Sequence, residues 1–487
     1  MPKDDLNVII VVLDSLRQDH VSFYNHGKAV FDGVPAAKTP NLDRVLADGI
    51  AFLNAYPSGL PTIPQRTELL TGQFTLPYKP WSPLNPYDLT AAALLKRRGY
   101  VTALISDTYH MFKPGYNLYS GLDYWEFIRG QEFDAHGVPP PKHRKIEDYC
   151  NNNVKNDPAW VSLLSKFLSN IDEFKDDEED DWFPCKVFSK AADWVHENRQ
   201  QDGHIFLWID SFDPHEPWEH PHSYDVSYGM GLDAKPRIIL PKGGEAMSWA
   251  SPEEITSIRK LYAGEVAFVD HCFERFYSTL KETGLLDNSI MLLLADHGHP
   301  LADHGKFLKG GDRMYSELLR VPFGIRLPSD VGSELGIKSG MSQDLIAVPD
   351  ALPTQIELLG FQEDAIPLAG RSFLPVLTGE KKGRNAVIMG YHEALDRCVR
   401  DGRYSYVSRP AGQPDELYDL EEDPREKRNL IDERPEEARR LAKVLRGVWA
   451  HTPQSYVKGL QGKYELYRYG RLPGIKSLGH EFLSKTS

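Results

Sequence analysis

The chain has 487 residues, of which 41% are hydrophobic and 26% charged, and its formal net charge is −14. This length exceeds a small single domain and allows a large core with an appendage. The acidic balance argues against general nucleic-acid binding, which needs a concentrated basic surface. No segment approaches the roughly 18 consecutive apolar residues of a membrane helix, and Asp4 and Asp5 stand where a signal peptide would be basic.

The first predicted element is a strand at residues 7–13, whose apolar run without alternation is typical of a strand covered on both faces. It leads into Asp14, and the carboxyl ends of such strands are where α/β sheets usually bind ligands. A helix is predicted from about residue 39 to Asp48, with Gly49 ending it.

The next element is a helix predicted to begin between Thr62 and Pro64, because proline is tolerated in a first helical turn. The free N–H groups of a helix start favour a bound phosphate or sulfate. Arg66 lies one turn beyond Thr62, so the two side chains can face one ligand. The alternative is an ordinary N-cap threonine with a solvent-facing arginine.

The middle of the chain alternates helices and strands. We expect a helix at 91–98, a strand at 101–105, a loop-rich insert at about 123–181, a helix at 187–198 and a strand at 204–209. A capping box at Ser251 starts a long helix that ends at Gly284. A strand at 289–294 then leads to Asp296 and His297.

This alternation predicts an α/β fold with a large, mostly parallel central sheet sandwiched by helices. We assign residues 1–377 to a catalytic domain. Residues 378–450 form a smaller α+β subdomain with short antiparallel strands and a helix from Pro435, and residues 451–487 form an extended tail. The tail could embrace a second subunit and so form a homo-oligomer.

The four cysteines, Cys150, Cys185, Cys272 and Cys398, show neither metal-type spacing nor a disulfide framework. We therefore expect a reducing, cytoplasmic location.

Asp14, Thr62, Asp296 and His297 combine two carboxylates, a hydroxyl and an imidazole, which is a plausible ligand set for one divalent cation. A metal on Thr62 would lower the pKa of its hydroxyl and prepare it for attack. Taken singly, an aspartate at a strand end is more often a cap or turn residue.

Together with these residues, several further motifs make the chain resemble the sulfatase branch of the alkaline-phosphatase superfamily nearly end to end. These motifs are Asp14-Ser15-Leu16-Arg17, Thr39-Pro40-Asn41-Leu42-Asp43, the turn from Thr62 to Gly72, Asp213-Pro214-His215-Glu216-Pro217, Ala295-Asp296-His297-Gly298, Asp303-His304-Gly305 with Lys309, and Glu416-Leu417-Tyr418-Asp419-Leu420. Within that branch the chain is most similar to the phosphonate monoester hydrolase and phosphodiesterase group.

The resemblance implies a role for each matching residue. Asp14, Asp296 and His297 should be metal ligands, and Thr62 both a ligand and the nucleophile. Arg66 should hold the nucleophile and a substrate oxygen. Three further sets complete the prediction: His215 and Lys309 on the anion or its leaving group, His110 and Thr108 as additional substrate contacts, and His304 as a substrate contact or, less favoured, part of a second metal site with Asp213 and His215.

Thr62 departs from the family pattern, because sulfatases carry a cysteine or serine there and oxidise it to formylglycine. Threonine cannot form that aldehyde, since its β-carbon bears a methyl group. Its covalent adduct has to be cleaved by water, which favours phosphate or phosphonate esters. Ser15 replaces a second aspartate, and His297 stands in place of asparagine, so the expected single metal is Mn²⁺ or Zn²⁺ rather than Ca²⁺.

The sequence thus predicts a metal-dependent hydrolase of small anionic phosphate or phosphonate mono- and diesters, without a nucleic-acid or membrane partner. A sulfuric ester hydrolase of the arylsulfatase type is the alternative enzyme. A catalytically inactive anion-binding protein is the alternative of another class, and the joint presence of Asp14, Arg66, Asp296, His297 and Lys309 argues against it.

Overall fold

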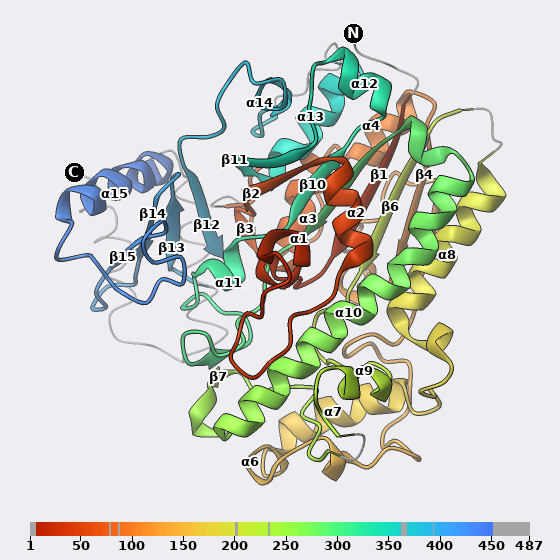
Figure 1. Ribbon diagram of the computed structural model, residues 1–487, viewed down its shortest axis with the longest axis vertical. Helices are drawn as coiled ribbons and strands as arrows, with labels where there is room; N and C mark the ends of the chain where they lie inside the picture. The colour runs from red at the N-terminus through yellow and green to blue at the C-terminus, as the bar shows by residue number, and fades with distance from the viewer. Residues whose placement is uncertain are drawn as a thin grey trace.

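The computed structural model describes residues 6–76, 79–85, 88–199, 203–231, 234–361, 368–392 and 394–450. Its largest feature is an eight-stranded sheet with the order β11-β2-β10-β8-β1-β6-β4-β5 (Figure 1). The strands are β1 (Asn7–Leu13), β2 (Ile50–Tyr56), β4 (Val101–Ser106), β5 (Tyr124–Phe127), β6 (Ile205–Ser211), β8 (Ser289–Ala295), β10 (Phe323–Arg326) and β11 (Gly340–Ala347). All pairings are parallel except those of β10 with β2 and β8. The predicted α/β class is confirmed.

Helices cover both faces of this sheet (Figure 1). On one face lie α2 (Pro40–Asp48), α8 (Phe183–Asn198) and α10 (Pro252–Glu282), and on the other α3 (Thr62–Thr71), α4 (Ala91–Arg97) and α13 (Ala351–Leu358). The connections hold α1 (Ser22–Asn25), α5 (Tyr109–Phe112), α6 (Asn152–Lys155), α7 (Pro158–Asn170), α9 (His222–Ser227), α11 (Ser316–Leu319), α12 (Ser329–Glu334), α14 (Leu374–Leu377), β7 (Gly244–Glu245) and β9 (Lys306–Phe307).

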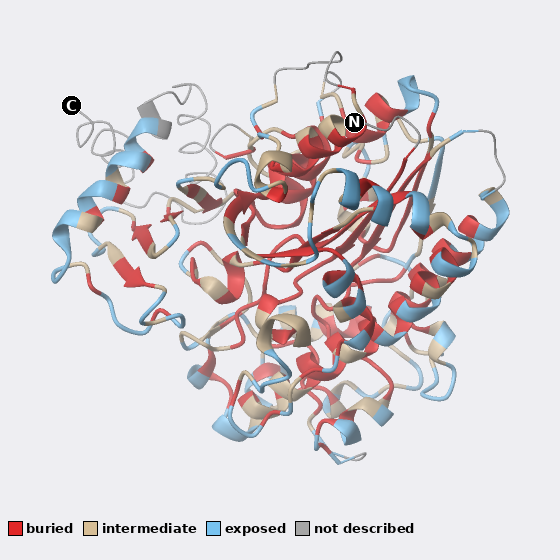
Figure 2. Cartoon of the chain, turned by 45° about the horizontal axis from the view of Figure 1, so that its top comes forward, coloured by how far each residue is buried: buried red, intermediate tan, exposed pale blue. Residues whose placement is uncertain are grey.

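The sheet is the core of the molecule. Every residue of β1, β6 and β8 is buried, as the apolar runs without alternation predict. Figure 2 shows these strands in red between helices whose outer faces are exposed. The capping box at the start of α10 is also confirmed, with both Ser251 and Glu254 making the expected hydrogen bonds.

A second sheet joins the C-terminal region to the catalytic domain. Its order is β15-β14-β13-β12-β3, and it consists of β12 (Val387–Tyr391), β13 (Arg397–Arg400), β14 (Tyr404–Ser408) and β15 (Glu416–Asp419), with α15 (Pro435–Ala450) packed against it. Its fifth strand, β3 (Gly59–Leu60), comes from the catalytic domain and pairs with β12 just before Thr62.

Two parts of the fold differ from the expectation. The insert at 123–181 is less irregular than predicted, because it contributes β5 to the edge of the central sheet and contains the thirteen-residue helix α7. The strands β2, β10 and β11 were not predicted. They lie at the other edge of the sheet, where β11 has a mixture of exposed and buried residues and β10 has only four residues.

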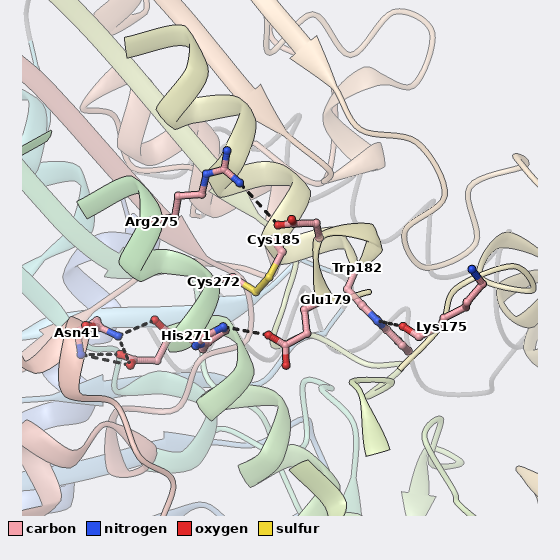
Figure 3. Close-up of a disulfide and its surroundings, with 10 residues drawn as sticks. Asn41, Lys175, Glu179, Trp182, Cys185, His271, Cys272 and Arg275 are labelled. Atoms are coloured by element: carbon pink, nitrogen blue, oxygen red, sulfur yellow. Dashed lines mark hydrogen bonds and ion pairs between the residues drawn. A yellow bond between two sulfur atoms is a disulfide. The ribbon is translucent and has the colours of Figure 1, made fainter. Parts of the chain in front are cut away.

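The cysteine prediction was wrong for one pair. Cys185 in α8 and Cys272 in α10 form a disulfide between two helices that pack side by side (Figure 3). The bridge joins residues 87 positions apart, a separation that no sequence-local spacing rule detects. Ion pairs flank it, including Glu179 with His271 at 3.0 Å. Cys150 and Cys398 are free and buried.

Within the described part of the chain, no helix combines the length and the apolar character needed to cross a bilayer. The predicted tail at 451–487, and with it the predicted oligomer contact, lies outside the described residues.

Candidate active site

The centre of the site lies where two neighbouring parallel strands end. β1 and β8 are paired with Leu13 opposite Ala295, so Asp14 and Asp296 emerge side by side. The backbone N–H of Ser15 donates to Asp296 Oδ1 at 3.0 Å, and the N–H of His297 donates to the same oxygen at 2.7 Å. The sheet therefore brings together residues that are far apart in sequence, as the strand-end argument predicts.

Asp14, Asp296 and His297 form a buried group whose ligand atoms all lie within 4.8 Å of one another. His297 Nδ1 donates to the Gly298 carbonyl at 2.8 Å, which leaves Nε2 as the atom turned toward the carboxylates, 3.4 Å from Asp296 Oδ2. Neither His297 Nε2 nor Asp14 Oδ2 makes a hydrogen bond, although both are fully buried. Buried polar atoms without partners are costly, and a bound cation would satisfy both.

The electrostatics of this group also fit a cation. Burial and the adjacent Asp296 carboxylate raise the pKa of Asp14 well above its usual value. Burial lowers the pKa of His297 to about 4, so the imidazole is neutral near pH 7 and can offer Nε2 as a ligand.

Arg66 lies among three carboxylates. It donates from Nε and Nη2 to the two oxygens of Asp210 at 2.8 and 2.7 Å, and from Nη1 to Asp296 at 2.6 Å. Its Nη2 is also 3.1 Å from Asp14 Oδ2. All four side chains are fully buried. When all three carboxylates are ionised, the single guanidinium leaves two negative charges, which a divalent ion would balance.

Thr62 is the first residue of α3 and is 2% exposed. Its carbonyl accepts a hydrogen bond from Arg66 Nη1 at 3.3 Å, which connects the start of the helix to the acidic group. Every residue of α3 is buried, so Arg66 is not the solvent-facing arginine of the alternative interpretation. The predicted helix start is confirmed.

Glu68 connects α3 to the strand that precedes it. Its carboxylate accepts from the N–H groups of Ser58 and Gly59 at 2.9 Å and from the N–H and hydroxyl of Thr75 at 2.8 and 2.9 Å. Because Gly59 begins β3, the orientation of Thr62 depends on this buried residue two turns further along the helix.

His215 and Lys309 contact each other. The Lys309 ammonium donates to His215 Nε2, and His215 Nδ1 donates to the Glu216 carbonyl at 2.5 Å. Burial and the Lys309 charge hold the pKa of His215 well below its usual value. Glu216 Oε2 lies 3.7 Å from Lys309 Nζ, and burial raises the pKa of this carboxyl to about 7.

The side chains of Thr108 and His110, which were predicted to contact a substrate, both have polar partners within the protein. The Thr108 hydroxyl donates to Asp210 Oδ1 at 2.7 Å, so this residue orients the carboxylate that holds Arg66. His110 places Nε2 2.9 Å from Glu132 and accepts from Lys113 at 3.1 Å through Nδ1. Thr108 thus supports Asp210, and its contact with a substrate stays a prediction, as does that of His110.

His304 has partners within the chain at both ring nitrogens. Its Nδ1 lies 2.7 Å from Glu317 and its Nε2 3.0 Å from the Glu426 carbonyl, so neither ring nitrogen is left for an anion. The ring stacks on Tyr315 at 3.8 Å. For the second metal site, both oxygens of Asp213 accept from Gln131 Nε2 at 2.9 Å. Among the described residues, no metal-type group contains Asp213, His215 or His304.

Asp210 is the important residue that the sequence analysis missed. It lies near the carboxyl end of β6, which is paired with β1 in the same sheet. The strand-end rule that identified Asp14 and Asp296 would have identified it as well.

Comparisons with protein families support the fold and the chemistry of the site. A family model described as Sulfatase matches residues 6–361. A second, described as N-sulphoglucosamine sulphohydrolase, C-terminal, matches residues 302–448. Members of the first family typically bind a divalent metal ion, and the buried group of Asp14, Asp296 and His297 provides ligands of the required types.

Individual relatives include a multifunctional member of the alkaline phosphatase superfamily and an arylsulfatase. The multifunctional alkaline phosphatase superfamily protein PehA from Trinickia caryophylli is 26% identical over 87% of this chain and 91% of its own length. An arylsulfatase from Clostridium perfringens is 25% identical over 95% of this chain and 96% of its own.

Solved structures show the same fold. The phosphonate monoester hydrolase of Agrobacterium radiobacter superposes with a TM-score of 0.67 at 21% identity, covering 95% of this chain and 97% of its own. BT4656, solved in complex with its substrate D-glucosamine-2-N,6-O-disulfate, also has a TM-score of 0.67, at 20% identity over 93% of this chain and 98% of its own.

Proposed function

The chain belongs to the sulfatase family of the alkaline phosphatase superfamily, and on this premise we propose that it hydrolyses phosphate or phosphonate mono- and diesters with Thr62 as the nucleophile. Family membership makes it a hydrolase acting on ester bonds. The observation that carries the finer proposal is that the residue at the buried start of α3 is a threonine, which cannot be oxidised to formylglycine. Arg66 joins it to the group of Asp14, Asp296 and His297.

Threonine favours a phosphoryl substrate because of how the covalent adduct breaks down. A formylglycine hydrate can expel sulfate by collapsing to the aldehyde, whereas a threonine ester has to be cleaved by water at phosphorus or sulfur. Attack on phosphorus is well suited to a site built from positioned cations and hydrogen-bond donors.

A divalent ion at Asp14, Asp296 and His297 would lower the pKa of the Thr62 hydroxyl and withdraw charge from a substrate oxygen. An imidazole ligand and the absence of a carboxylate at Ser15 favour Mn²⁺ or Zn²⁺ over Ca²⁺. The two uncompensated charges around Arg66 support a single ion.

The residues then act in sequence. Thr62 Oγ1 releases its proton to water and forms a bond to phosphorus while the bond to the leaving oxygen breaks. The leaving oxygen takes a proton from water, with the Lys309 ammonium hydrogen-bonded to it. Arg66 Nη1 and Nη2 stabilise charge on the phosphoryl group. Water then attacks the phosphothreonine and restores the hydroxyl. His215, whose ring is neutral, takes a proton from this water at Nε2, the atom that Lys309 leaves when it turns to the leaving oxygen, and a proton returns to Thr62 Oγ1.

Sulfuric ester hydrolysis is the second candidate, because an arylsulfatase is among the relatives and a disulfated glucosamine is the substrate of one structural neighbour. Small anionic esters are the substrate class that both candidates share.

The deciding experiment compares matched 4-nitrophenyl phosphate, phosphodiester, phosphonate and sulfate esters on one preparation with added Mn²⁺, Zn²⁺ or Ca²⁺. The proposal expects a higher kcat/KM for at least one phosphorus ester than for the sulfate, with Mn²⁺ or Zn²⁺ most effective. A higher kcat/KM for the sulfate ester would overturn the phosphoryl assignment, and turnover of none of them would favour an anion-binding protein.

A further inference from the structure

A cavity of about 670 Å³ lies between the catalytic domain and the C-terminal region. Its walls come from the loop that follows β1 at residues 17–32, from Arg259 in α10, from the region of α11 and from the loop at 424–427. None of the proposed catalytic or metal-binding residues lines it. The volume is in the range of sites that hold small molecules.

Basic side chains dominate the lining. Five of them have no ion pair with any carboxylate among the described residues, and these are Lys28, Arg259, Arg320, Arg425 and Lys427. Neutral oxygens occupy part of their hydrogen-bonding capacity: Arg259 Nε donates to the Leu301 carbonyl at 2.9 Å, and Arg425 Nη2 to the Val30 carbonyl at 2.6 Å. Lys427 donates to the Asp303 carbonyl.

The acidic residues of the cavity are mostly neutralised by other groups. Asp19 and Asp303 both pair with Arg17, at 2.6 and 2.7 Å, and Glu317 pairs with His304 at 2.7 Å. Of the acidic lining residues, Asp32 alone has no ion pair within the described chain. The lining holds six basic side chains, Arg17 included, and four acidic ones, which is a local surplus of two positive charges in a chain whose net charge is −14.

Two of the arginines that line the cavity lie against the same aromatic ring. Arg259 Cζ lies 3.9 Å from the centre of the Phe31 ring, and Arg17 Cζ lies 5.4 Å from it. Burial lowers the pKa of Arg259, the Asp303 carboxylate raises it in opposition, and the charges of Arg17 and Arg425 lower it. Like charges held together in a partly enclosed space repel unless an anion is shared between them.

We propose that this cavity binds a ligand carrying two or more phosphate or sulfate groups, at a site separate from the reaction centre. Guanidinium groups suit such oxyanions because their N–H donors can contact two oxygens at once. A surplus of two positive charges exceeds what one monovalent anion can neutralise, so the class of ligand is multiply charged. Because Arg425 and Lys427 come from the C-terminal region and Arg259 from α10, such a ligand would bridge the two parts of the molecule.

Inorganic tripolyphosphate is the first probe, titrated calorimetrically into the Thr62→Ala protein after dialysis to remove bound metal. We expect one equivalent to bind, and the added substitutions Arg425→Gln and Lys427→Gln to weaken binding about ten-fold or more. Arg428→Gln is the matched control, because this arginine belongs to the same segment but pairs with Glu433 at 2.7 Å, and it should leave binding unchanged.

A second set of variants tests whether tripolyphosphate binds in the cavity or at the reaction centre. Lys309→Ala should leave tripolyphosphate binding unchanged, and Arg425→Gln in the otherwise native protein should leave ester turnover unchanged. Loss of binding in Lys309→Ala with retention in the Arg425→Gln and Lys427→Gln protein would overturn the proposal, as would failure to bind either tripolyphosphate or a disulfated disaccharide. If both probes bind, the site accepts phosphate and sulfate groups alike. If only tripolyphosphate binds, the site is specific for phosphate, and if only the disulfated disaccharide binds, it is specific for sulfate.

Discussion

Arg66 makes a set of contacts that a lysine could not reproduce. Its planar fork holds both oxygens of Asp210 while Nη1 reaches Asp296 and the Thr62 carbonyl. One side chain therefore fixes the start of α3 relative to the ends of β6 and β8. A lysine carries a single charged atom and would leave some of these buried oxygens without a partner.

Replacing Thr62 tests the nucleophile directly. Thr62→Ala should lower kcat/KM for the best phosphorus ester by about 10³-fold or more, because it removes the hydroxyl that forms the covalent bond. Thr67→Val is the matched control: it lies in the same helix, is equally buried and has a hydroxyl without a hydrogen-bond partner, so its loss should leave activity nearly unchanged. Equal effects of the two substitutions on steady-state rates would argue against a role for Thr62.

Metal content tests the ligand set. Protein purified without chelator should hold one Mn²⁺ or Zn²⁺ per chain by elemental analysis. Asp14→Asn and His297→Ala should weaken metal binding at least about 100-fold, since each removes an atom of the buried group. Asp213→Asn should keep the stoichiometry, because both of its oxygens already accept from Gln131. A loss of metal only in Asp213→Asn would contradict this assignment.

At the scale of elements, the sequence correctly predicted those features that depend on interactions between residues close together in the chain. The start of α3, the capping box of α10 and the buried runs of β1 and β8 were predicted because proline position, side-chain caps and apolar periodicity act within a few residues. β3 could not be predicted in this way, because two residues form a strand only through pairing with β12, more than 300 positions later.

Contacts between residues far apart in sequence also decide the surroundings of the site residues. Asp14, Asp296 and His297 were predicted from strand ends and motifs, and the structure brings them together. The partners of Thr108 and His304 depend on side chains far away in sequence, Asp210 in one case and Glu317 with the Glu426 carbonyl in the other. A motif gives the position of a residue along the chain but not its hydrogen-bond partner.

The bridge between α8 and α10 should stabilise their packing. Cys185→Ser should lower the free energy of unfolding by about 2–4 kcal/mol, measured by denaturant titration without reductant. A reductant should lower the stability of the native protein in the same way and leave that of the variant unchanged. If reductant has no effect on either protein, the bridge does not form in solution.

The bridge also bears on the predicted cytoplasmic location, which stays a prediction. Disulfides are rare in reducing compartments. Thiol counting on denatured protein from its native host should therefore find four reactive cysteines if the location is cytoplasmic and the bridge is open, and two if the bridge of Cys185 with Cys272 forms there.

At the scale of the whole molecule, the C-terminal region is attached beside the nucleophile. β3 belongs to its sheet and ends just before the helix that begins with Thr62. His304 adds a second connection, since it bridges Glu317 of the catalytic domain and the carbonyl of Glu426. Displacing the C-terminal sheet would therefore disturb the position of Thr62 without touching the metal ligands.

The contribution of the His304 contacts to the stability of the folded protein should depend on pH. The hydrogen bond to Glu317 raises the pKa of His304 above its usual value, in opposition to burial. The folded state therefore holds this proton to higher pH than the unfolded state, so the contribution to stability is complete below about pH 6.5 and is lost as pH rises through the raised pKa. The melting temperature of the native protein should fall more from pH 6 to pH 8 than that of His304→Gln. Parallel curves would show that His304 does not carry the proton.

The most direct test of the account is mass spectrometry of the enzyme quenched with acid during turnover of an activated aryl phosphorus ester. The account predicts a phosphoryl adduct on the peptide that contains Thr62, absent from Thr62→Ala and more abundant in a His215→Ala protein, where the second step is slowed. An adduct on another residue, or full turnover with no adduct in either protein, would contradict it.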